Sequence, residues 1–255
     1  MAENVVAAIA LNEFKLSSGE RFVAVGKRSN CLDKQVIKIV HPEKLIELPD
    51  GEVGEIWISG PSVAAGYWRK PELTAEVFQV TIQNEENNLT RIYLRTGDLG
   101  FYEEDYLYIC GRKKDIIIVF GRNYYPQDIE HETQNAALGV RPGCVAAFSR
   151  NESEEDEKLV IVFEIRKEYE RRRKEVIENV RSAVATNVGL IPNRIVAIKE
   201  KKILKTTSGK IQRKANCKAL YNGDFEKNIV YDWRGESMKA SQGTGDVRKG
   251  GVDLL

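Results

Sequence analysis

Short apolar runs separated by turn residues fill the first half of the chain, and this pattern predicts an antiparallel sheet. The runs are RFVAVG, QVIKIV, EIWISG, RIYLRTGD and YLYICG, between residues 21 and 111. The segment PELTAEVFQ (71–79) interrupts them and predicts a short helix with proline at its start. We therefore expect a small antiparallel sheet or barrel up to about residue 110.

Strands and helices alternate after residue 115. The expected strands are DIIIVFG, GCVAAFS, KLVIVFEI and RIVAI, which are mostly apolar. Helices are expected over residues 126–138, which begin with proline, and over residues 169–189. The second helix has four aliphatic residues on one face, namely Val176, Ile177, Val180 and Val184. The alternation predicts a compact α+β unit over about residues 115–221.

The composition changes beyond Asn222. The C-terminal segment ESMKASQGTGDVRKGGVDLL is rich in glycine and serine and poor in apolar residues. We therefore expect residues 222–255 to form a flexible tail.

The net charge of the chain limits the kinds of partner that it is expected to bind. The 255 residues contain 39 Lys and Arg and 38 Asp and Glu, so the net charge is +1. This balance argues against binding of nucleic acid or an anionic membrane, although a local basic cluster can still bind a small anion. No stretch reaches the roughly 18–20 apolar residues that span a bilayer, and the N-terminus lacks the basic residues of a secretory signal. The sequence therefore predicts a cytosolic protein with no membrane span.

Cysteine and histidine usage argues against several kinds of site. The four cysteines are scattered without a CxxC pair, which disfavours a zinc site or a disulfide framework. His41 and His131 are the two histidines of the sequence. So few histidines argue against a histidine-based metal site or a Ser-His-Asp triad.

Lys210 is the first candidate for chemistry. It follows a glycine in LKTTSGKIQRK (204–214), a polar loop that can place a point charge on a phosphate or carboxylate oxygen. The loop is not a Walker loop, because GxxxxGK followed by Ser or Thr is absent. Taken alone, a Gly-Lys pair in such a loop is more often solvated surface.

Asp98 and Arg112 are the second and third candidates. Asp98 ends YLRTGD at a glycine turn, where a carboxylate can accept hydrogen bonds from the vicinal diol of a ribose. Arg112 begins RKKD, and its guanidinium could reach a phosphate or the ribose. The alternatives are an aspartate that stabilises a turn and a basic strand end on the surface.

The four motifs GEIWISGPSVAAGYW, YLRTGD, GRKKD and TTSGK, in this order, resemble the adenylate-forming superfamily. That superfamily includes acyl-CoA synthetases, luciferases, peptide-synthetase adenylation domains and fatty acyl-AMP ligases. The resemblance covers about residues 1–220 and implies an α/β (α+β) fold. Residues 1–112 would form an antiparallel, barrel-like C-terminal remnant of the large AMP-binding domain, and residues 113–221 a small mobile lid domain.

The segment from Gly111 to Glu130 refines the resemblance. Arg112–Asp115 matches the hinge between the two domains, and Lys114 falls at the hinge position itself. GRNYYPQDIE (121–130) resembles the corresponding segment of fatty acyl-AMP ligases more than that of coenzyme A ligases. Fatty acyl-AMP ligases transfer the acyl group to the phosphopantetheine of an acyl carrier protein.

Glu3 is a candidate by resemblance alone. The chain opens Met-Ala-Glu-Asn, which is similar to the end of a superfamily motif whose glutamate is linked to Mg²⁺. The rest of that motif would lie upstream, so we expect this chain to be the C-terminal part of a longer enzyme.

The resemblance implies ATP-dependent activation of a fatty acid, with ATP and Mg²⁺ as cofactors. Lys210 would stabilise charge at the α-phosphate, Asp98 and Arg112 would bind the nucleotide, Lys114 would serve the hinge and Glu3 would help to hold Mg²⁺. The acceptor would be a carrier-protein thiol. A coenzyme A ligase of the same superfamily and a non-catalytic regulatory fragment are the alternatives.

Overall fold

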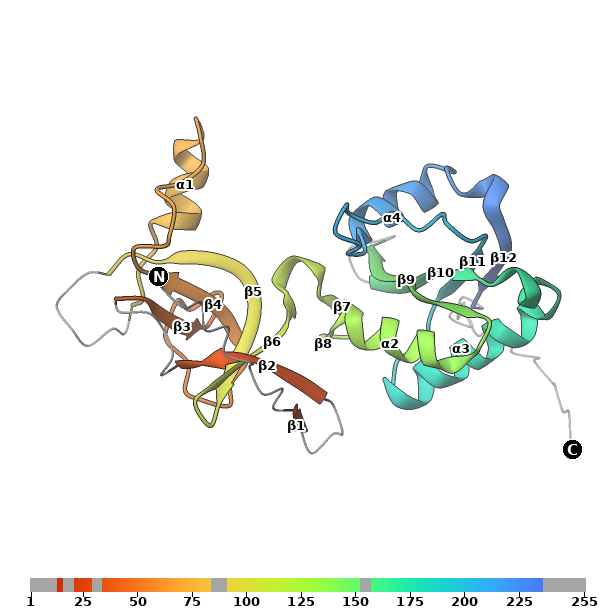
Figure 1. Cartoon of the computed structure of the whole chain (residues 1–255), viewed down its shortest axis with the longest axis horizontal. Coiled ribbons are helices and arrows are strands. Elements are labelled where there is room, and N and C mark those ends of the chain that lie inside the picture. The colour runs from red at the N-terminus through yellow and green to blue at the C-terminus, as the bar shows by residue number, and fades with distance from the viewer. Residues whose placement is uncertain (1–12, 16–20, 29–33, 84–90, 152–156, 236–255) are drawn as a thin grey trace, which may run out of the picture.

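The protein is described by a computed structural model that covers residues 13–15, 21–28, 34–83, 91–151 and 157–235. Figure 1 shows two bodies of secondary structure, one on each side of a short connection after β6. The first contains a six-stranded sheet and the second a four-stranded sheet with helices. Glu3 lies outside the described residues.

The six-stranded sheet is antiparallel throughout, in the order β1-β2-β6-β5-β4-β3. Its strands are β1 (Glu13–Lys15), β2 (Arg21–Lys27), β3 (Val36–Val40), β4 (Gly54–Ser59), β5 (Leu94–Glu103) and β6 (Tyr106–Arg112). Helix α1 (Pro71–Phe78) lies between β4 and β5 in the sequence. It begins at proline, as predicted.

This sheet is strongly curved, but it does not close. β5 bends along its length (Figure 1), with a register shift against β6 between Leu99 and Gly100. A Cβ atom at Gly100 would lie 2.3 Å from the carbonyl oxygen of Tyr108, so only glycine permits this close approach of the strands. β1 and β3 are the edges of the sheet, so the expected barrel is an open sheet in the described part of the chain.

The four-stranded sheet has the order β12-β11-β10-β9. Its strands are β9 (Val140–Asn151), β10 (Glu157–Ile165), β11 (Arg194–Ile198) and β12 (Ile229–Arg234). β10 and β11 are parallel, because the 3₁₀ turn Lys167–Arg172 and helix α3 (Arg173–Asn187) cross over between them. The other two pairs are antiparallel.

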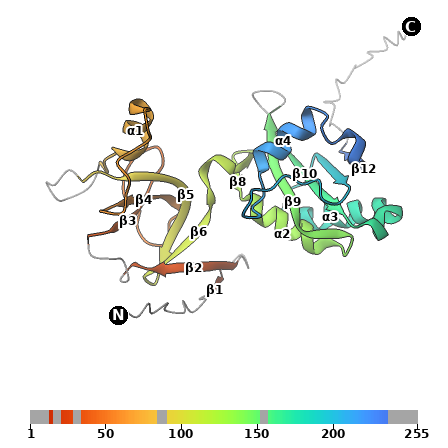
Figure 2. The same cartoon turned by 45° about the horizontal axis from the view of Figure 1, so that its top comes forward.

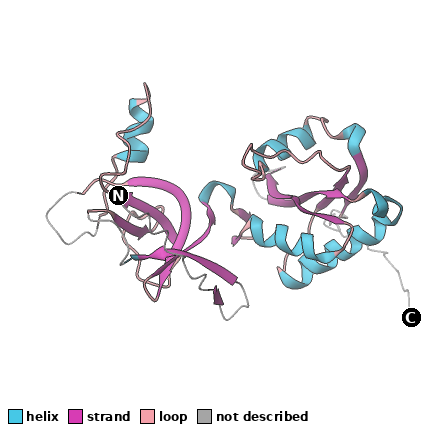
Figure 3. Cartoon of the chain, viewed as in Figure 1, coloured by secondary structure: helices cyan, strands magenta, loops and turns pink. Residues whose placement is uncertain are grey.

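Both faces of this sheet are covered, which explains why its strands are nearly continuous apolar runs. Helices α2 (Pro126–Ala136) and α3 pack on one face, and α4 (Arg213–Tyr221) packs on the other (Figures 1 and 3). The aliphatic stripe predicted for the second helix is buried against the sheet, and each such side chain stabilises the fold by about 1.5–3 kcal/mol. The prediction of that helix is confirmed, whereas α4 was not predicted.

The predicted start of the flexible tail at residue 222 is wrong. Residues 226–228 form a 3₁₀ turn, and β12 then pairs along the whole of β11. Phe225 is buried on the α4 face of the sheet, and Trp233 packs on the opposite face. The segment IVYDW has the β-branched and aromatic content of a strand, and the glycine-rich composition begins only after it.

The connection between the two bodies is short. β6 runs into the 3₁₀ turn Lys113–Asp115, called η2 here, and then into the hairpin of β7 (Ile117–Val119) and β8 (Arg122–Tyr124), which leads into α2 (Figure 2). None of the helices in the described ranges is both long and apolar enough to cross a bilayer.

Candidate functional site

Asp98 and Arg112 lie directly opposite each other on β5 and β6. Arg112 Nε donates a hydrogen bond of 3.0 Å to Asp98 Oδ1, and the Asp98 side chain is 32% exposed. Gly97 precedes the aspartate with φ +73°, a conformation that favours glycine. The carboxylate is thus oriented by the strand pairing but remains accessible to a ligand.

A buried ion pair supports β5 next to this site. Glu55 on β4 is almost fully buried, and Arg95 Nη2 donates to its Oε2 at 2.7 Å. Thr96 Oγ1 donates to the carbonyl oxygen of Ile56 at 2.7 Å and accepts a hydrogen bond of 3.0 Å from the backbone N–H of Asp98. These contacts fix the backbone that presents Asp98.

The predicted hinge lies immediately after this site. Lys114 is the central residue of η2, and its side chain is exposed. Just before η2, Gly111 has φ +152°, and a Cβ atom there would meet the Gln127 amide at 2.8 Å. Gln127 Nε2 donates to the carbonyl oxygen of Cys110, and Tyr125 packs against the apolar cluster around Cys110. The start of α2 therefore contacts the end of β6.

Lys210 lies on a closed turn. The backbone N–H of Thr206 donates to the carbonyl oxygen of Lys210 at 2.8 Å, and the N–H of Lys210 donates to Thr206 Oγ1 at 3.0 Å. Gly209 has φ +84°, which closes the turn. The Lys210 side chain is exposed, and within the described residues its ammonium makes no ion pair.

Asn216 holds the base of this turn from α4. Its side chain is fully buried, its Oδ1 accepts the N–H of Leu204 at 3.0 Å, and its Nδ2 donates to the carbonyl oxygen of Leu204 at 2.9 Å. Nδ2 also contacts the carbonyl oxygen of Gln212 at 2.9 Å. Both ends of the loop are therefore bound to one amide group.

Replacing Asn216 with alanine should lower the free energy of unfolding by about 2 kcal/mol, because it leaves the partners of a buried amide unpaired. Urea unfolding followed by circular dichroism measures this change. Asn222→Ala is the control at the exposed end of the same helix and should change the unfolding free energy by less than about 0.5 kcal/mol. Equal effects of the two substitutions would show that the amide does not hold the loop.

Glu164 on β10 anchors the segment before the loop. Its side chain is 1% exposed, and it accepts hydrogen bonds from the N–H groups of Lys202 at 2.6 Å and Ile203 at 2.7 Å. Arg141 Nη1 donates to it at 2.5 Å. Burial by itself raises the pKa of Glu164, but these hydrogen bonds outweigh it and hold the pKa below its ordinary value of 4.5.

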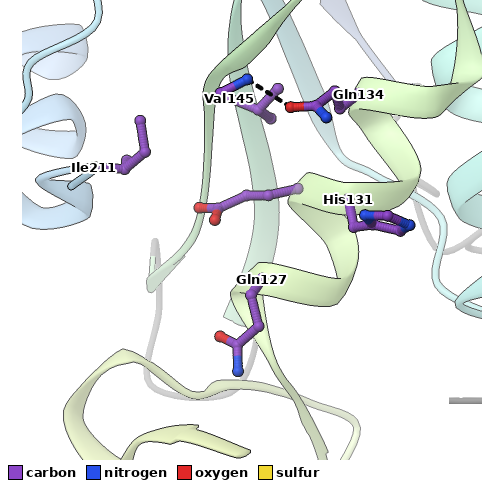
Figure 4. Close-up of a pocket in the computed structure, with 7 residues that line it drawn as sticks. Gln127, His131, Gln134, Val145 and Ile211 are labelled. Carbon is purple, nitrogen blue, oxygen red and sulfur yellow. Dashed lines mark hydrogen bonds between the residues drawn. The ribbon is translucent and has the colours of Figure 1, made fainter. Parts of the chain in front are cut away.

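A small cavity of about 230 Å³ lies between α2, β9 and the residue after Lys210 (Figure 4). Its lining includes Gln127, Glu130, Gln134, Gly143 and Ile211. The N–H of Gly143 donates to Gln134 Oε1 at 2.5 Å. None of the residues predicted to bind the nucleotide lines this cavity, so it is not the expected nucleotide site.

The structure thus brings together some predicted site residues and not others. Asp98 and Arg112 are paired, and Lys114 follows two residues later. Within the described ranges, no hydrogen bond or ion pair joins Lys210 to Asp98 or Arg112, and no group of three or more His, Cys, Asp or Glu side chains could hold a metal ion. The supporting residues Glu164 and Asn216 were not predicted. The only signal for Asn216 was a polar residue near apolar positions in ANCKAL.

Comparisons with known proteins identify the family of this chain. A family model described as Disco-interacting protein 2-like, AMP domain, matches residues 114–229. The putative fatty-acid–CoA ligase FadD25 of Mycobacterium tuberculosis is 42% identical over 200 residues, which are 76% of this chain and 33% of that protein. The long-chain-fatty-acid–AMP ligase FadD32 of Mycolicibacterium smegmatis is 37% identical over 210 residues, covering 72% of this chain and 33% of that protein.

Two further matches cover similar shares of this chain and of the matched proteins. The medium-chain-fatty-acid–[acyl-carrier-protein] ligase JamA of Moorena producens is 39% identical over 187 residues, covering 72% of this chain and 31% of that protein. A solved structure from a study of fatty acyl-adenylate ligases of E. coli and L. pneumophila has a TM-score of 0.64 and 30% identity, over 82% of this chain and 34% of that one.

A curved antiparallel sheet, a short connection and a small α+β body, with these sequence matches, define an adenylate-forming architecture. The chain belongs to the adenylate-forming superfamily of AMP-dependent synthetases. It spans about a third of the length of the curated relatives that it matches.

Proposed function

We propose that this chain forms the ribose-binding edge, the hinge and the lid of an enzyme that activates a fatty acid with ATP. The activated product is acyl-AMP, and the acyl group then passes to the phosphopantetheine thiol of an acyl carrier protein. The observation that carries the proposal is the accessible Asp98–Arg112 pair beside η2, combined with an exposed Lys210 on a closed turn. Residues 1–112 and the α+β body from residue 113 act as separate domains in this proposal.

Each proposed role follows from the chemistry of the side chain. Asp98 accepts hydrogen bonds from the two ribose hydroxyls, and Arg112 orients that carboxylate. Rotation at Lys114 brings Lys210 to the α-phosphate, where its ammonium stabilises the negative charge that accumulates as the fatty acid carboxylate attacks. Pyrophosphate leaves in this step, and AMP leaves when the carrier thiol takes the acyl group.

The residues near Lys210 suit an anionic substrate. Between residues 199 and 218 the sequence has seven lysines and one arginine against one acidic residue. Lys201, Lys202, Lys214 and Lys218 are exposed like Lys210, so this surface attracts phosphate groups. The magnesium role proposed for Glu3 lies outside the described residues, and we assign no step to it.

The identity of the thiol that accepts the acyl group is a separate part of the proposal. GRNYYPQDIE and the names of FadD32 and JamA support acyl-AMP formation followed by transfer to a carrier protein. The name of FadD25 favours a second candidate, a fatty-acid–coenzyme A ligase. The two candidates share the first step and differ in the thiol that receives the acyl group.

Mass spectrometry of the reaction products tests the proposal. The proteins are the chain itself and a chimera in which residues 34–235 replace the aligned third of FadD32. Each is given ATP, Mg²⁺ and dodecanoate, with coenzyme A or with a phosphopantetheinylated carrier protein. We expect acyl-AMP and acyl-carrier protein from the chimera and no product from the chain alone. A folded chimera that makes no acyl-AMP, beside active FadD32, would refute the activity, and acyl-coenzyme A would select the second candidate.

Replacing Asp98 with alanine in the chimera should raise the KM for ATP about tenfold or more, because a hydrogen bond to a charged group is worth about 1.5–3 kcal/mol. The unfolding free energy should change by less than about 1 kcal/mol, since the Asp98–Arg112 pair is partly exposed. Asp50→Ala is the matched control, because Asp50 also forms an exposed pair, with Arg28 at 2.5 Å. A similar KM change in both variants would contradict the ribose-binding role.

A further inference from the structure

Arg213 connects three elements, namely α4, α2 and η2. It is the first residue of α4, three positions after Lys210. Its Nε and Nη2 donate to the two carboxylate oxygens of Glu130 on α2, both at 2.8 Å. Its Nη1 donates to Asp115 Oδ2 at 3.3 Å, and Asp115 is the last residue of η2.

The cluster is too buried to be an ordinary surface ion pair. The side chains of Arg213, Asp115 and Glu130 are 21%, 15% and 13% exposed. Glu130 Oε1 also accepts the backbone N–H of Ala147 at 3.0 Å, which ties the cluster to β9. Two-point binding between a guanidinium and a carboxylate fixes orientation as well as distance.

The loop that carries Lys210 is fixed to the same arginine. Only Ile211 and Gln212 separate Lys210 from Arg213, and the N–H of Gln212 donates to the carbonyl oxygen of Leu204 at 3.0 Å. Ile211 packs against the apolar cluster under α4. A displacement of Arg213 therefore displaces the Lys210 turn.

We propose that Arg213 is a positioning residue that couples the predicted hinge to the Lys210 loop. Through Asp115 it makes the loop and the segment next to Lys114 move as one body, so that rotation at the hinge places Lys210 without a separate ordering step. This inference rests on the proposed function for its purpose, but the mechanical coupling can be measured without any catalytic activity. A loop held by its own hydrogen bonds alone would not respond to a change at Asp115.

Hydrogen–deuterium exchange of the whole chain, read by NMR, tests the coupling. The reporters are loop amides that donate hydrogen bonds, those of Thr206, Gly209, Lys210 and Gln212. Arg213→Gln should accelerate their exchange tenfold or more. Asp115→Asn should accelerate it severalfold, although within the described residues Asp115 bonds to Arg213 and not to residues 204–212.

Arg194→Gln is the matched control. Arg194 makes a similarly buried two-point pair with Asp232, at 2.8 and 2.7 Å, between β11 and β12. Within the described residues it touches α4 only at the ring of Tyr221, at the end of the helix opposite to Arg213 and the loop. The substitution should lower global stability without accelerating the loop amides selectively. The coupling is refuted if Arg213→Gln and Arg194→Gln have equal effects on the loop at matched stability, or if Asp115→Asn has none.

Enzyme kinetics of an Arg213 variant of the chimera distinguish failure of this inference from failure of the proposed function. Arg213→Lys keeps the charge but loses the two-point geometry, so it should lower kcat for acyl-AMP formation with little change in the KM for ATP. An unchanged kcat together with accelerated loop exchange would refute the positioning role while leaving acyl-AMP formation intact. An inactive parent chimera would instead count against the proposed function and leave the exchange result valid.

Discussion

Replacing Lys210 with alanine in the FadD32 chimera should lower the rate of acyl-AMP formation by about 10²–10³-fold. A preorganised charge at the site where negative charge develops typically contributes this much, about 3–4 kcal/mol. The side chain is exposed and unpaired within the described residues, so the unfolding free energy should not change measurably. Release of pyrophosphate and mass spectrometry of acyl-AMP measure the rate.

Lys214→Ala is the control for this prediction. Lys214 carries the same charge on α4, four residues later, and is also exposed. It contributes to the positive surface but lies outside the closed turn, so its removal should reduce the rate less than threefold. Equal losses in the two variants would show that only the summed charge matters and that Lys210 has no special position.

Replacing Glu164 with alanine should destabilise the protein by about 3–5 kcal/mol. The substitution removes a buried carboxylate, and the main cost comes from the N–H groups of Lys202 and Ile203, which lose their acceptor. Arg141 also loses its partner, but its side chain is 36% exposed and can be hydrated. Chemical unfolding at pH 7 measures the change. Glu178→Ala is the control, because Glu178 also pairs with an arginine at 2.5 Å but on an exposed helix surface. It should have no measurable effect.

The contribution of Glu164 should also depend on pH. Its folded-state pKa is lowered, so its stabilising effect is fully present above the ordinary value of 4.5 and is lost as the pH falls through the lower folded value. The stability difference between the protein and Glu164→Gln should therefore be constant above about pH 5 and shrink as the pH falls further. A difference that grows on acidification would contradict the lowered pKa.

The sequence predicted those elements and motifs that can be recognised within a few consecutive residues. The apolar runs of β10 and β11 and the aliphatic stripe of α3 are visible in single windows of residues, because burial imposes the period of each element. The same holds for the motifs that indicate the superfamily, since each motif is a few consecutive residues. The functional roles of Asp98, Arg112, Lys114 and Lys210 remain predictions, and so does that of Glu3.

Other features needed the tertiary structure because they join residues that are distant in the sequence. Arg112 is 14 positions from Asp98, Glu164 is 39 from Ile203, and Arg213 is 98 from Asp115. The open form of the six-stranded sheet and the pairing of β12 likewise depend on strand order and register. Local composition cannot specify which partner a buried charge or a strand edge will meet, because that choice is made by the whole set of long-range contacts.

The sequence by itself determined most of the helices and strands, the superfamily and the lysine loop of this protein, but not α4 or β12. The tertiary structure decided that Asp98 and Arg112 are paired, that Asn216 and Glu164 hold the loop, and that Arg213 connects it to the segment beside Lys114. The physical reason is that periodicity and turn chemistry act over a few residues. Hydrogen bonds between buried polar groups instead require the chain to bring distant residues within about 3 Å of each other.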